Sequence, residues 1–530
     1  MAAAAAAASR SYRRLFGRCV GYAVGGTAVA TVVVLAPPLE AVPQPLLPAR
    51  VLCEGVGRVC RCVYVAGHIF IDYQWNLHGD ASQEAWNAAH LRNASRLVTL
   101  AETNGGLYVK AGQIFANMGH ILPRQYCTTM AALQDAVMSR PFSEVVATLE
   151  YELRHPVSEV FSELDPTPIA AASLAQVHRG RLKKEQVEVA VKVQYLDIAH
   201  RFRGDMRTIQ LMLGIAGFFF RGYDLSEIVS KLNSTVANEL DFTLEADNCE
   251  RAGRDLKAGG FGTRVVTVDV LRDYTRRRVL TTRLVSNAVK ISDLRGIETL
   301  GIKPRIVAAW FYDALAYQLF TTGFVHGDPH AGNVLVHRLP NGQPQVVLLD
   351  FGLCTELSDE LRAELAYIWT AAVTHDTPSL QKVAKRFGCD DYALFASCFL
   401  QHPYEFFNAE SRVTTKTTQE MMRDQVRHKM HEVNDIVSRL PKEYALVLRN
   451  IMAAKAINRE LHEPVNRPLR MLRYSVCAAQ GTRSRWQVSC MLLRAWWSEV
   501  ISSLLVAYAK WSHPELMQML DDSLELQLSG

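Results

Sequence analysis

The chain has 530 residues, of which 49% are hydrophobic and 21% are charged. This length suits two or three domains, and the hydrophobic fraction is high enough to exclude wholesale disorder. The net charge of +5, from 58 basic and 53 acidic residues, is too small to indicate nucleic-acid binding. The eleven cysteines are scattered without the spacing of a zinc site, and their odd number is typical of a reducing compartment.

The first 40 residues have the composition of a targeting segment. Several arginines lie between residues 10 and 18, and the first acidic residue of the chain is Glu40. An arginine-bearing, acid-free start is typical of a mitochondrial presequence. The uncharged stretch 19–39 is just long enough to cross a bilayer, although its glycines weaken it as a membrane span. We therefore predict a presequence and a weak transmembrane segment over residues 1–40, and a location at the mitochondrial inner membrane.

A secretory signal peptide is the alternative interpretation of the same segment, because a basic start followed by an apolar run also fits that pattern. It would make the protein secreted or endomembrane, and the Asn-X-Ser/Thr sequences at Asn93 and Asn233 would then be glycosylation acceptors. The cysteine pattern argues against an oxidising compartment and favours the mitochondrial interpretation.

Residues 41–160 are predicted to form a helical extension. They begin with a proline-rich stretch, residues 41–50, that we expect to be a linker. Beyond it, apolar residues recur at helical spacing, for example Leu97, Leu100 and Leu107. The extension contains the sequence Asn-Gly-Gly-Leu-Tyr-Val-Lys-Ala-Gly-Gln, which ends at Gln113.

Two strand-like runs follow, residues 177–182 and 188–193, and a polar turn joins them. Lys192 lies in the second run as Val-Ala-Val-Lys, the form taken by the kinase strand lysine that contacts the nucleotide phosphates. A strand lysine on its own is usually a solvated side chain. The Asp and Asn residues further along the chain favour the functional interpretation of Lys192.

An alanine-rich segment stands before these strands, where kinases have a glycine-rich loop. It comprises Ala170, Ala171, Ala172 and Ser173. Glycines let backbone N–H groups approach phosphate closely, whereas three methyl groups stiffen the loop. We therefore predict that ATP phosphates near this segment sit differently from those in ordinary kinases.

Residues 198–221 and 226–252 are predicted helices, and the second is rich in acidic residues. A kinase needs one glutamate to hold the strand lysine. Spacing alone leaves Glu239, Glu245 and Glu250 open for this role, and surface charge is the ordinary interpretation, above all for Glu250. A strand leading to an interlobe hinge then completes a predicted kinase-like N-lobe over residues 161–285.

The strongest signal is the sequence His-Gly-Asp-Pro-His-Ala-Gly-Asn at residues 326–333, followed by Asp-Phe-Gly at residues 350–352. Two apolar runs joined by an Asn-Gly turn lie between them, which predicts a hairpin that brings Asn333 and Asp350 to one end. We predict that these two residues hold Mg²⁺, and that Asp328 is the catalytic residue that orients or deprotonates the attacking hydroxyl. Two unrelated turns are the alternative interpretation.

The C-terminal part is predicted to be almost entirely helical, with a C-lobe over residues 286–420 and a further helical region over residues 421–530. The Ala-Pro-Glu motif of protein kinases is missing after Asp350, and a helix is expected to begin near Ser358. That interval docks peptides in ordinary kinases, so its loss argues against protein substrates. Leu493 and Trp497 lie in an apolar stripe that we expect to pack in the core, with a membrane-facing surface as the alternative.

Together these motifs resemble the aarF/UbiB family of atypical kinases over residues 85–460. The residues from Lys110 to Gln113 resemble the KxGQ motif of that family, and those from Glu239 to Asp241 resemble its ExD motif. The alanine-rich segment and the loop at residues 326–333 resemble two further family motifs. The resemblance implies an α+β, atypical protein-kinase-like, two-lobed fold with a helical N-terminal extension and extra C-terminal helices.

The resemblance also implies roles for individual residues. Glu245 is the family glutamate that pairs with Lys192. Lys110 and Gln113 lie on a helix across the substrate cleft, where the acidic residues Glu239 and Asp241 meet it. Such an insertion would exclude a peptide and leave room for a small or lipidic acceptor, or for water. Arg283 stands at the hinge where many relatives have an acid, which leaves the base preference open.

Two functions follow from these expectations. The first is an atypical kinase or ATPase that uses ATP and Mg²⁺ and acts at a membrane in mitochondrial lipid or coenzyme Q homeostasis. The resemblance implies a lipid or isoprenoid molecule and coenzyme Q biosynthetic proteins as partners. The alternative is a nucleotide-binding pseudokinase scaffold for lipids or biosynthetic enzymes. Asp328 favours the first function and the alanine-rich segment favours the second. A secreted protein kinase is a third interpretation, which the missing peptide-docking segment disfavours.

Overall fold

The structure is a computed structural model that describes residues 47–76, 82–116, 122–134, 139–196, 198–219, 240–401, 439–462 and 465–478, with isolated positions between 404 and 512. The predicted presequence and membrane segment, and Glu239 of the ExD motif, lie outside the described residues. The chain divides into two compact units. Unit 1 comprises residues 1–247 and 269–284, and unit 2 comprises residues 248–268 and 285–530.

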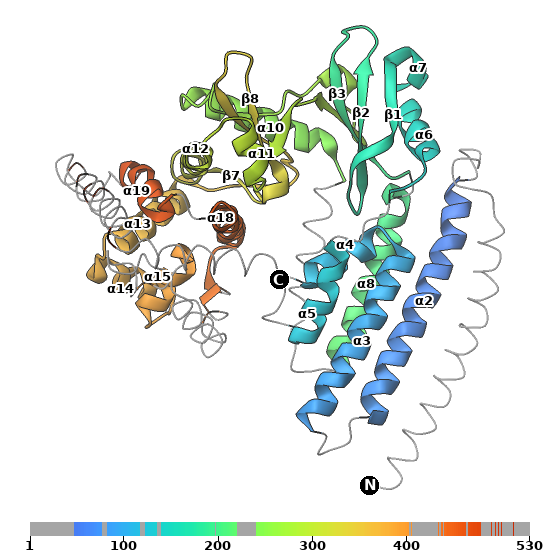
Figure 1. The fold of residues 1–530 in the computed structure, drawn as a ribbon. Helices are drawn as coiled ribbons and strands as arrows, with labels where there is room; N and C mark the ends of the chain where they lie inside the picture. The colour runs from blue at the N-terminus through green and yellow to red at the C-terminus, as the bar shows by residue number, and fades with distance from the viewer. Residues whose placement is uncertain are drawn as a thin grey trace. The chain divides into compact units, whose positions relative to one another are not determined.

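The first part of unit 1 is helical, as its apolar spacing predicts. Long helices α2, α3 and α8 pack together, with the shorter α4 and α5 against α3 (Figure 1). Helix α3 begins where the Ser82 hydroxyl accepts a hydrogen bond from the Ala85 N–H, and ends at Gly105, whose φ of 63° suits glycine. The elements are α2 (Leu47–Asn76), α3 (Gln83–Asn104), α4 (Leu107–Ala116), α5 (Arg124–Met130), η3 (Ala131–Gln134) and α8 (Ile198–Phe219). In the described part of the chain, none of the helices is both long and apolar enough to cross a bilayer.

The rest of unit 1 is built on an antiparallel sheet with strand order β1-β2-β3-β5. Strands β2 and β3 confirm the two predicted strands, whereas β1 is an addition that the sequence did not indicate. Residues Val189 and Val191 of β3 are buried in a core with Leu149 of α6, while Lys192 is half-buried on the opposite face. The elements are α6 (Phe142–Leu153), α7 (Val157–Val160), β1 (Phe161–Ala171), β2 (Ala175–Leu182), β3 (Glu188–Gln194), η4 (Arg272–Tyr274) and β5 (Val279–Arg283).

Helix α10 (Phe242–Ala258) confirms the later part of the predicted helix over residues 226–252 and extends it to Ala258, whereas residues 226–239 lie outside the described residues. Leu240 forms a turn and Asp241 is not helical, so the helix starts at Phe242. The reason is local, because the Asp241 carboxylate accepts hydrogen bonds from the Thr243 N–H, at 3.0 Å, and from its hydroxyl. The acidic residue that was expected inside a helix therefore forms the start of one.

The centre of unit 2 is a four-stranded sheet with strand order β4-β9-β8-β6, beside a small pair formed by β7 and β10. Strands β8 and β9 confirm the predicted hairpin, with Val334 opposite Leu348. Helix α12 leads through one π-helical turn to Gly323, whose φ is 73°, and then into β7. The elements are β4 (Val265–Thr267), β6 (Ala288–Lys290), α11 (Leu294–Thr299), α12 (Pro304–Tyr317), η5 (Gln318–Thr322), β7 (Phe324–His326), η6 (Ala331–Asn333), β8 (Val334–Arg338), β9 (Pro344–Leu348) and β10 (Cys354–Glu356).

Five further helices complete the described part of unit 2: α13 (Asp359–Val373), α14 (Thr377–Arg386), α15 (Tyr392–Leu400), α18 (Lys442–Glu460) and α19 (Arg467–Ala478). The predicted start near Ser358 is confirmed, because the Ser358 hydroxyl accepts the Leu361 N–H at 3.3 Å. Helix α19 is fixed to α12 by a buried Asp313 that binds Arg470 and Arg473.

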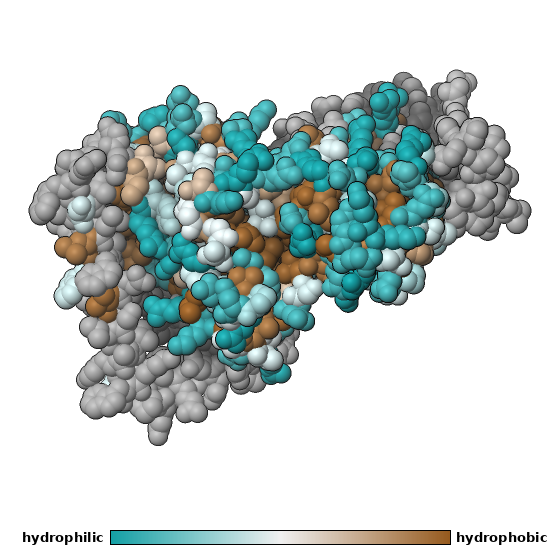
Figure 2. Space-filling model, turned by 90° about the horizontal axis from the view of Figure 1, so that it is seen from above, coloured by the Kyte–Doolittle hydropathy of each residue, from teal (hydrophilic) through white to brown (hydrophobic). Residues whose placement is uncertain are grey.

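The surface mixes hydrophobic and hydrophilic residues. Figure 2 shows hydrophobic residues dispersed among hydrophilic ones on one face. Scattered exposed hydrophobic side chains are normal for folded proteins. The expectation that Leu493 and Trp497 pack in the core is wrong, because they are 64% and 57% exposed. An apolar spacing on a helix does not by itself say that another element covers that face.

Candidate functional site

The strand lysine of unit 1 forms an ion pair with Glu245. The Lys192 ammonium lies 2.8 and 2.9 Å from the two carboxylate oxygens of Glu245, which α10 presents in its first turn. The side chains of Lys192 and Glu245 are only 21% and 5% exposed. The Phe242 ring centroid lies 5.0 Å from the Lys192 ammonium and adds a cation–π contact. The pairing is the one implied by the family resemblance.

The other two candidate glutamates have different outcomes. Glu250 lies on α10, half-buried, with Arg254 at 3.9 Å one turn further along the helix. This is an ordinary helical surface pair, worth a few tenths of a kcal/mol. Glu239 lies outside the described residues. Asp241, its partner in the ExD motif, starts α10 and lies 3.6 Å from the Arg277 guanidinium.

The alanine-rich segment forms a tight turn between β1 and β2. Ala170 and Ala171 end β1, and the Ala172 N–H donates to the Ala175 carbonyl at 2.7 Å. The Tyr195 hydroxyl donates to the Ala172 carbonyl at 2.9 Å, which fixes the turn to the end of β3. Ser173 is buried. The Ala172 N–H is thus used inside the protein, whereas a glycine-rich loop offers such groups to phosphate.

Helix α4 carries the KxGQ motif and packs beneath this turn. Leu107 and Tyr108 of α4 share an apolar cluster with Leu174 of the turn. The Gln113 amide donates to the Leu133 carbonyl at 2.9 Å, and Lys110 is half-buried on the same helix. Helix α4 is therefore held to the alanine-rich segment by apolar packing.

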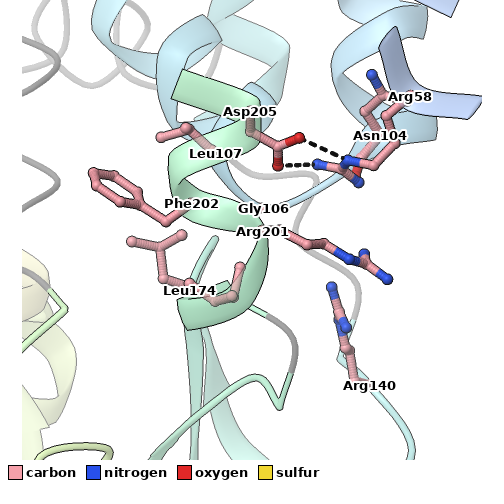
Figure 3. Close-up of a pocket in the computed structure, with 10 residues that line it drawn as sticks. Arg58, Asn104, Gly106, Leu107, Arg140, Leu174, Arg201, Phe202 and Asp205 are labelled. Carbon is pink, nitrogen blue, oxygen red and sulfur yellow. Dashed lines mark hydrogen bonds and ion pairs between the residues drawn. The ribbon is translucent and has the colours of Figure 1, made fainter. Parts of the chain in front are cut away.

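A pocket lies at the N-terminal end of α4, lined by arginines from three segments and by apolar side chains (Figure 3). Arg58 of α2 binds both carboxylate oxygens of Asp205 of α8, at 2.9 and 2.6 Å, and also donates to the Asn104 carbonyl. The remaining arginines have acidic neighbours too, because Arg201 pairs with Glu54 and Arg140 with Glu144. The charges of this pocket are therefore balanced, and its ion pairs join α2 to α8, while the hydrogen bond from Arg58 to the Asn104 carbonyl joins α2 to α3.

The loop at residues 326–333 begins at the end of β7 and is organised by His326. The His326 Nδ1 accepts the Asp328 N–H at 3.1 Å, so its Nε2 carries the proton and donates to the Leu349 carbonyl at 3.1 Å. Burial lowers the pKa of His326, which favours this neutral form. The imidazole thus joins the loop that contains Asp328 to the strand that leads to Asp350.

Glycine is required at position 327. A Cβ atom there would lie 2.9 Å from the Leu353 carbonyl oxygen, and the Gly327 N–H donates to that same oxygen at 2.8 Å. Ordinary protein kinases have arginine at this position, between the histidine and the catalytic aspartate. The close backbone approach excludes any side chain here.

The predicted metal ligands meet at one end of the hairpin. The Leu349 N–H donates to the Asn333 carbonyl at 2.8 Å, so Asn333 and Asp350 are brought together as the spacing predicts. Asp350 has a φ of 51° and its carboxylate accepts the Gly352 N–H at 3.2 Å. Such a left-handed conformation costs about 1–3 kcal/mol and is typical of functional sites. Phe351 is buried, with its ring centroid 4.7 Å from that of His326.

One amide oxygen and one carboxylate fit Mg²⁺, which takes few protein ligands and completes its octahedron with water and substrate phosphates. No group of three or more His, Cys, Asp or Glu side chains among the described residues could hold a metal ion. Asn333 and Asp350 supply two ligands, so nucleotide phosphates and water would supply the remaining ones.

Sequence reasoning missed a contribution from α18. Asn450 is fully buried and its amide donates to the His326 carbonyl at 2.7 Å. Its neighbour Arg449 places one guanidinium nitrogen 2.6 Å from the Asp328 carboxylate. These residues lie more than 120 positions from their partners and belong to no local motif, so nothing in the sequence singled them out.

Residues 132–384 match the family described as ABC1 atypical kinase-like domain. The chain is 30% identical over 484 residues to the ABC1 family protein lscO of Purpureocillium lilacinum, covering 82% of this chain and 81% of that protein. It is 28% identical over 404 residues to AarF domain-containing protein kinase 1 of Xenopus laevis, covering 74% and 77%. The chain belongs to the ABC1/AarF family of atypical kinases, and the predicted α+β, kinase-like fold class is confirmed.

A similar protein of greater length is the probable serine/threonine-protein kinase abkD of Dictyostelium discoideum. It is 36% identical over 409 residues, which make up 76% of this chain. The matched region spans 58% of the abkD protein.

Proposed function

We propose that the protein is an atypical kinase or ATPase that binds MgATP. The observation that carries the proposal is the ion pair between Lys192 and Glu245. A lysine held on a strand by a carboxylate of a neighbouring helix is the arrangement by which kinases anchor the nucleotide phosphates. The low exposure of both side chains means that the ammonium is fixed in place before any ligand arrives.

The proposal gives residues of each unit a role in the use of MgATP. Lys192 would contact the α- and β-phosphates, while Asn333 and Asp350 would hold Mg²⁺. The metal would supply positive charge that neutralises the β- and γ-phosphate oxygens. Asp328 would orient the attacking oxygen and accept its proton, because phosphoryl transfer depends on positioning and charge more than on a protein nucleophile.

We further propose a small or lipidic acceptor, or water. Strand β10 ends at Glu356 and α13 begins at Asp359, which leaves little chain for the segment that docks peptides in protein kinases. The proposed setting is mitochondrial lipid or coenzyme Q homeostasis at the inner membrane, with coenzyme Q biosynthetic proteins as partners. It rests on the arginine-bearing, acid-free N-terminus and on the family resemblance. Asn93 is fully buried, which disfavours a glycan at this position.

A phosphate-release assay on the purified protein tests the activity, with and without liposomes and quinone-like phenols. We expect release by the wild type and a loss of at least about 100-fold in Lys192→Ala and in Asp350→Asn. Lys184→Ala is the matched control, because this exposed lysine lies in the nearby β2–β3 turn. Full turnover by Lys192→Ala would refute the assignment.

The second candidate function is a nucleotide-binding pseudokinase scaffold. The hydrogen bond of the Ala172 N–H to the Ala175 carbonyl favours it, because that donor is then unavailable to phosphate. Thermal-shift titrations with MgATP and MgADP separate the two functions when they are run beside the phosphate-release assay. Strong stabilisation by nucleotide without release supports the scaffold, whereas stabilisation with release supports the enzyme.

A further inference from the structure

Helix α18 contacts the catalytic loop although it lies beyond residues 132–384, the part of the chain that matches the family domain. Its Asn450 binds the carbonyl of His326, and its Arg449 binds the carboxylate of Asp328. Two adjacent residues of one helix thus reach the backbone and the acidic side chain of the same loop.

The position of Arg449 along the chain is fixed on both sides. The Tyr444 hydroxyl donates to the Leu361 carbonyl at 2.7 Å, and the Ala454 carbonyl accepts a hydrogen bond from Tyr312 of α12. The side chains of Tyr444 and Ile451 are buried. The backbone that carries Arg449 is therefore anchored about one and a half helical turns on either side, although the Arg449 side chain is 45% exposed.

The catalytic loop has no cation of its own. Its sequence from His326 to Asn333 contains neither lysine nor arginine, and the arginine of ordinary protein kinases is replaced by Gly327. A side chain at position 327 would meet the Leu353 carbonyl. The positive charge beside Asp328 comes instead from a helix that is remote in sequence.

We propose that Arg449 is the positioning residue for Asp328 in phosphoryl transfer, so that α18 is part of the active site. This inference rests on the proposed kinase or ATPase function. The charge-assisted hydrogen bond from Arg449 holds Asp328 Oδ2 and fixes the rotamer of the carboxylate. Asp328 Oδ1 then faces the acceptor hydroxyl or water and accepts its proton.

The same bonds form and break whether the acceptor is a hydroxyl or water. The acceptor oxygen forms a bond to the γ-phosphorus, and the bond from that phosphorus to the bridging oxygen breaks. ADP leaves with the electron pair of that bond, and the proton of the hydroxyl passes to Asp328. Arg449 forms and breaks no covalent bond, and its contribution is to the orientation of the base.

The test compares phosphate release and MgATP binding in single and double variants. We expect Arg449→Ala to lower kcat about 10- to 100-fold with little change in KM for ATP, and Arg449→Lys to recover part of the loss. Asp328→Asn combined with Arg449→Ala should turn over no more slowly than Asp328→Asn alone. The first change already removes the base that Arg449 orients, so the second change has nothing further to disturb. Arg459→Ala is the matched control, since this arginine is exposed on the same helix.

The outcomes separate the inference from the function on which it rests. If the wild type turns over ATP and Arg449→Ala does so equally fast, the role of Arg449 is refuted and the enzyme stands. Faster turnover by Arg449→Ala also refutes it, because the guanidinium would then obstruct the base. If the wild type binds MgATP and releases no phosphate, the proposed function fails and this inference fails with it.

Discussion

The two units hold their charged site residues in different ways. In unit 1, Lys192 and Glu245 meet through both carboxylate oxygens, and their side chains are 21% and 5% exposed. In unit 2, Arg449 and Asp328 meet through one short contact, and their side chains are 45% and 29% exposed. A buried pair is costly to break, whereas an exposed pair is weak and is screened by solvent.

This contrast matches the different tasks that we propose for the two pairs. A lysine that anchors phosphates serves best when it is fixed in advance, because positioning done before binding costs nothing during the reaction. A carboxylate that accepts a proton needs access to the acceptor, so it cannot be buried against its cation. We therefore propose a rigid anchor in unit 1 and an accessible base in unit 2.

The largest expected effect comes from breaking the anchor. Glu245→Ala leaves Lys192 without the carboxylate that holds it, and we expect a loss of about 3–5 kcal/mol in the free energy of unfolding of unit 1. Glu250→Ala on the same helix is the control, because Glu250 forms an i, i+4 pair with Arg254 of the kind worth about 0.3–0.5 kcal/mol. Urea denaturation measures both. Equal losses in the two variants would show that burial of the Lys192 pair has no energetic consequence.

The second largest effect is expected from a substitution at Gly327, where the backbone lies close to the Leu353 carbonyl. It tests the rigidity of the loop that carries Asp328. Gly327→Ala forces a Cβ atom to 2.9 Å from the Leu353 carbonyl oxygen. We expect a destabilisation of about 1–3 kcal/mol together with loss of phosphate release. Gly204→Ala serves as the control. Gly204 lies in helix α8, and a Cβ atom at this position would meet nothing within 4 Å. A loop that accommodates the methyl group without loss of stability or activity would contradict the proposed rigidity.

The local parts of this site are readable from the sequence, and the long-range parts are not. The hairpin between Asn333 and Asp350 follows from two apolar runs and an Asn-Gly turn, all within a few residues of one another. Strand β1 was missed because its Asp-Pro-Thr-Pro stretch interrupts the alternation of a strand, and most of it is solvent-exposed. Prolines are tolerated there because β1 is an edge strand of its sheet.

Side chains that are distant in sequence explain the remaining omissions. Arg449 lies 121 residues from Asp328, and Arg58 lies 147 residues from Asp205. In the sequence, each of these arginines looks like any charged residue on a helix. Only the packing of α18 and of α2 decides which of them meets a carboxylate, and packing is a property of the whole fold.

The pH dependence of His326 gives a smaller effect. Burial lowers its pKa in the folded protein, so the unfolded chain binds a proton that the folded one does not, and stability falls as pH drops below about 6.5. His326 contributes up to about 1.4 kcal/mol per pH unit to this slope. His326→Asn keeps an acceptor for the Asp328 N–H and cannot titrate. We expect its unfolding free energy, measured from pH 5 to 7, to fall less steeply than that of the wild type, and parallel curves would contradict the assignment.

The smallest effect is expected at the exposed pair and completes the comparison. Arg449→Ala removes a contact of 2.6 Å, yet solvent screens both charges, so we expect a loss of less than about 1 kcal/mol in the unfolding free energy. Added salt should reduce the difference between this variant and the wild type, because exposed charges are screened. A loss as large as that of Glu245→Ala would mean that Arg449 acts as a structural anchor. A small loss of stability combined with a large loss of turnover is the result that distinguishes an orienting side chain from a scaffolding one.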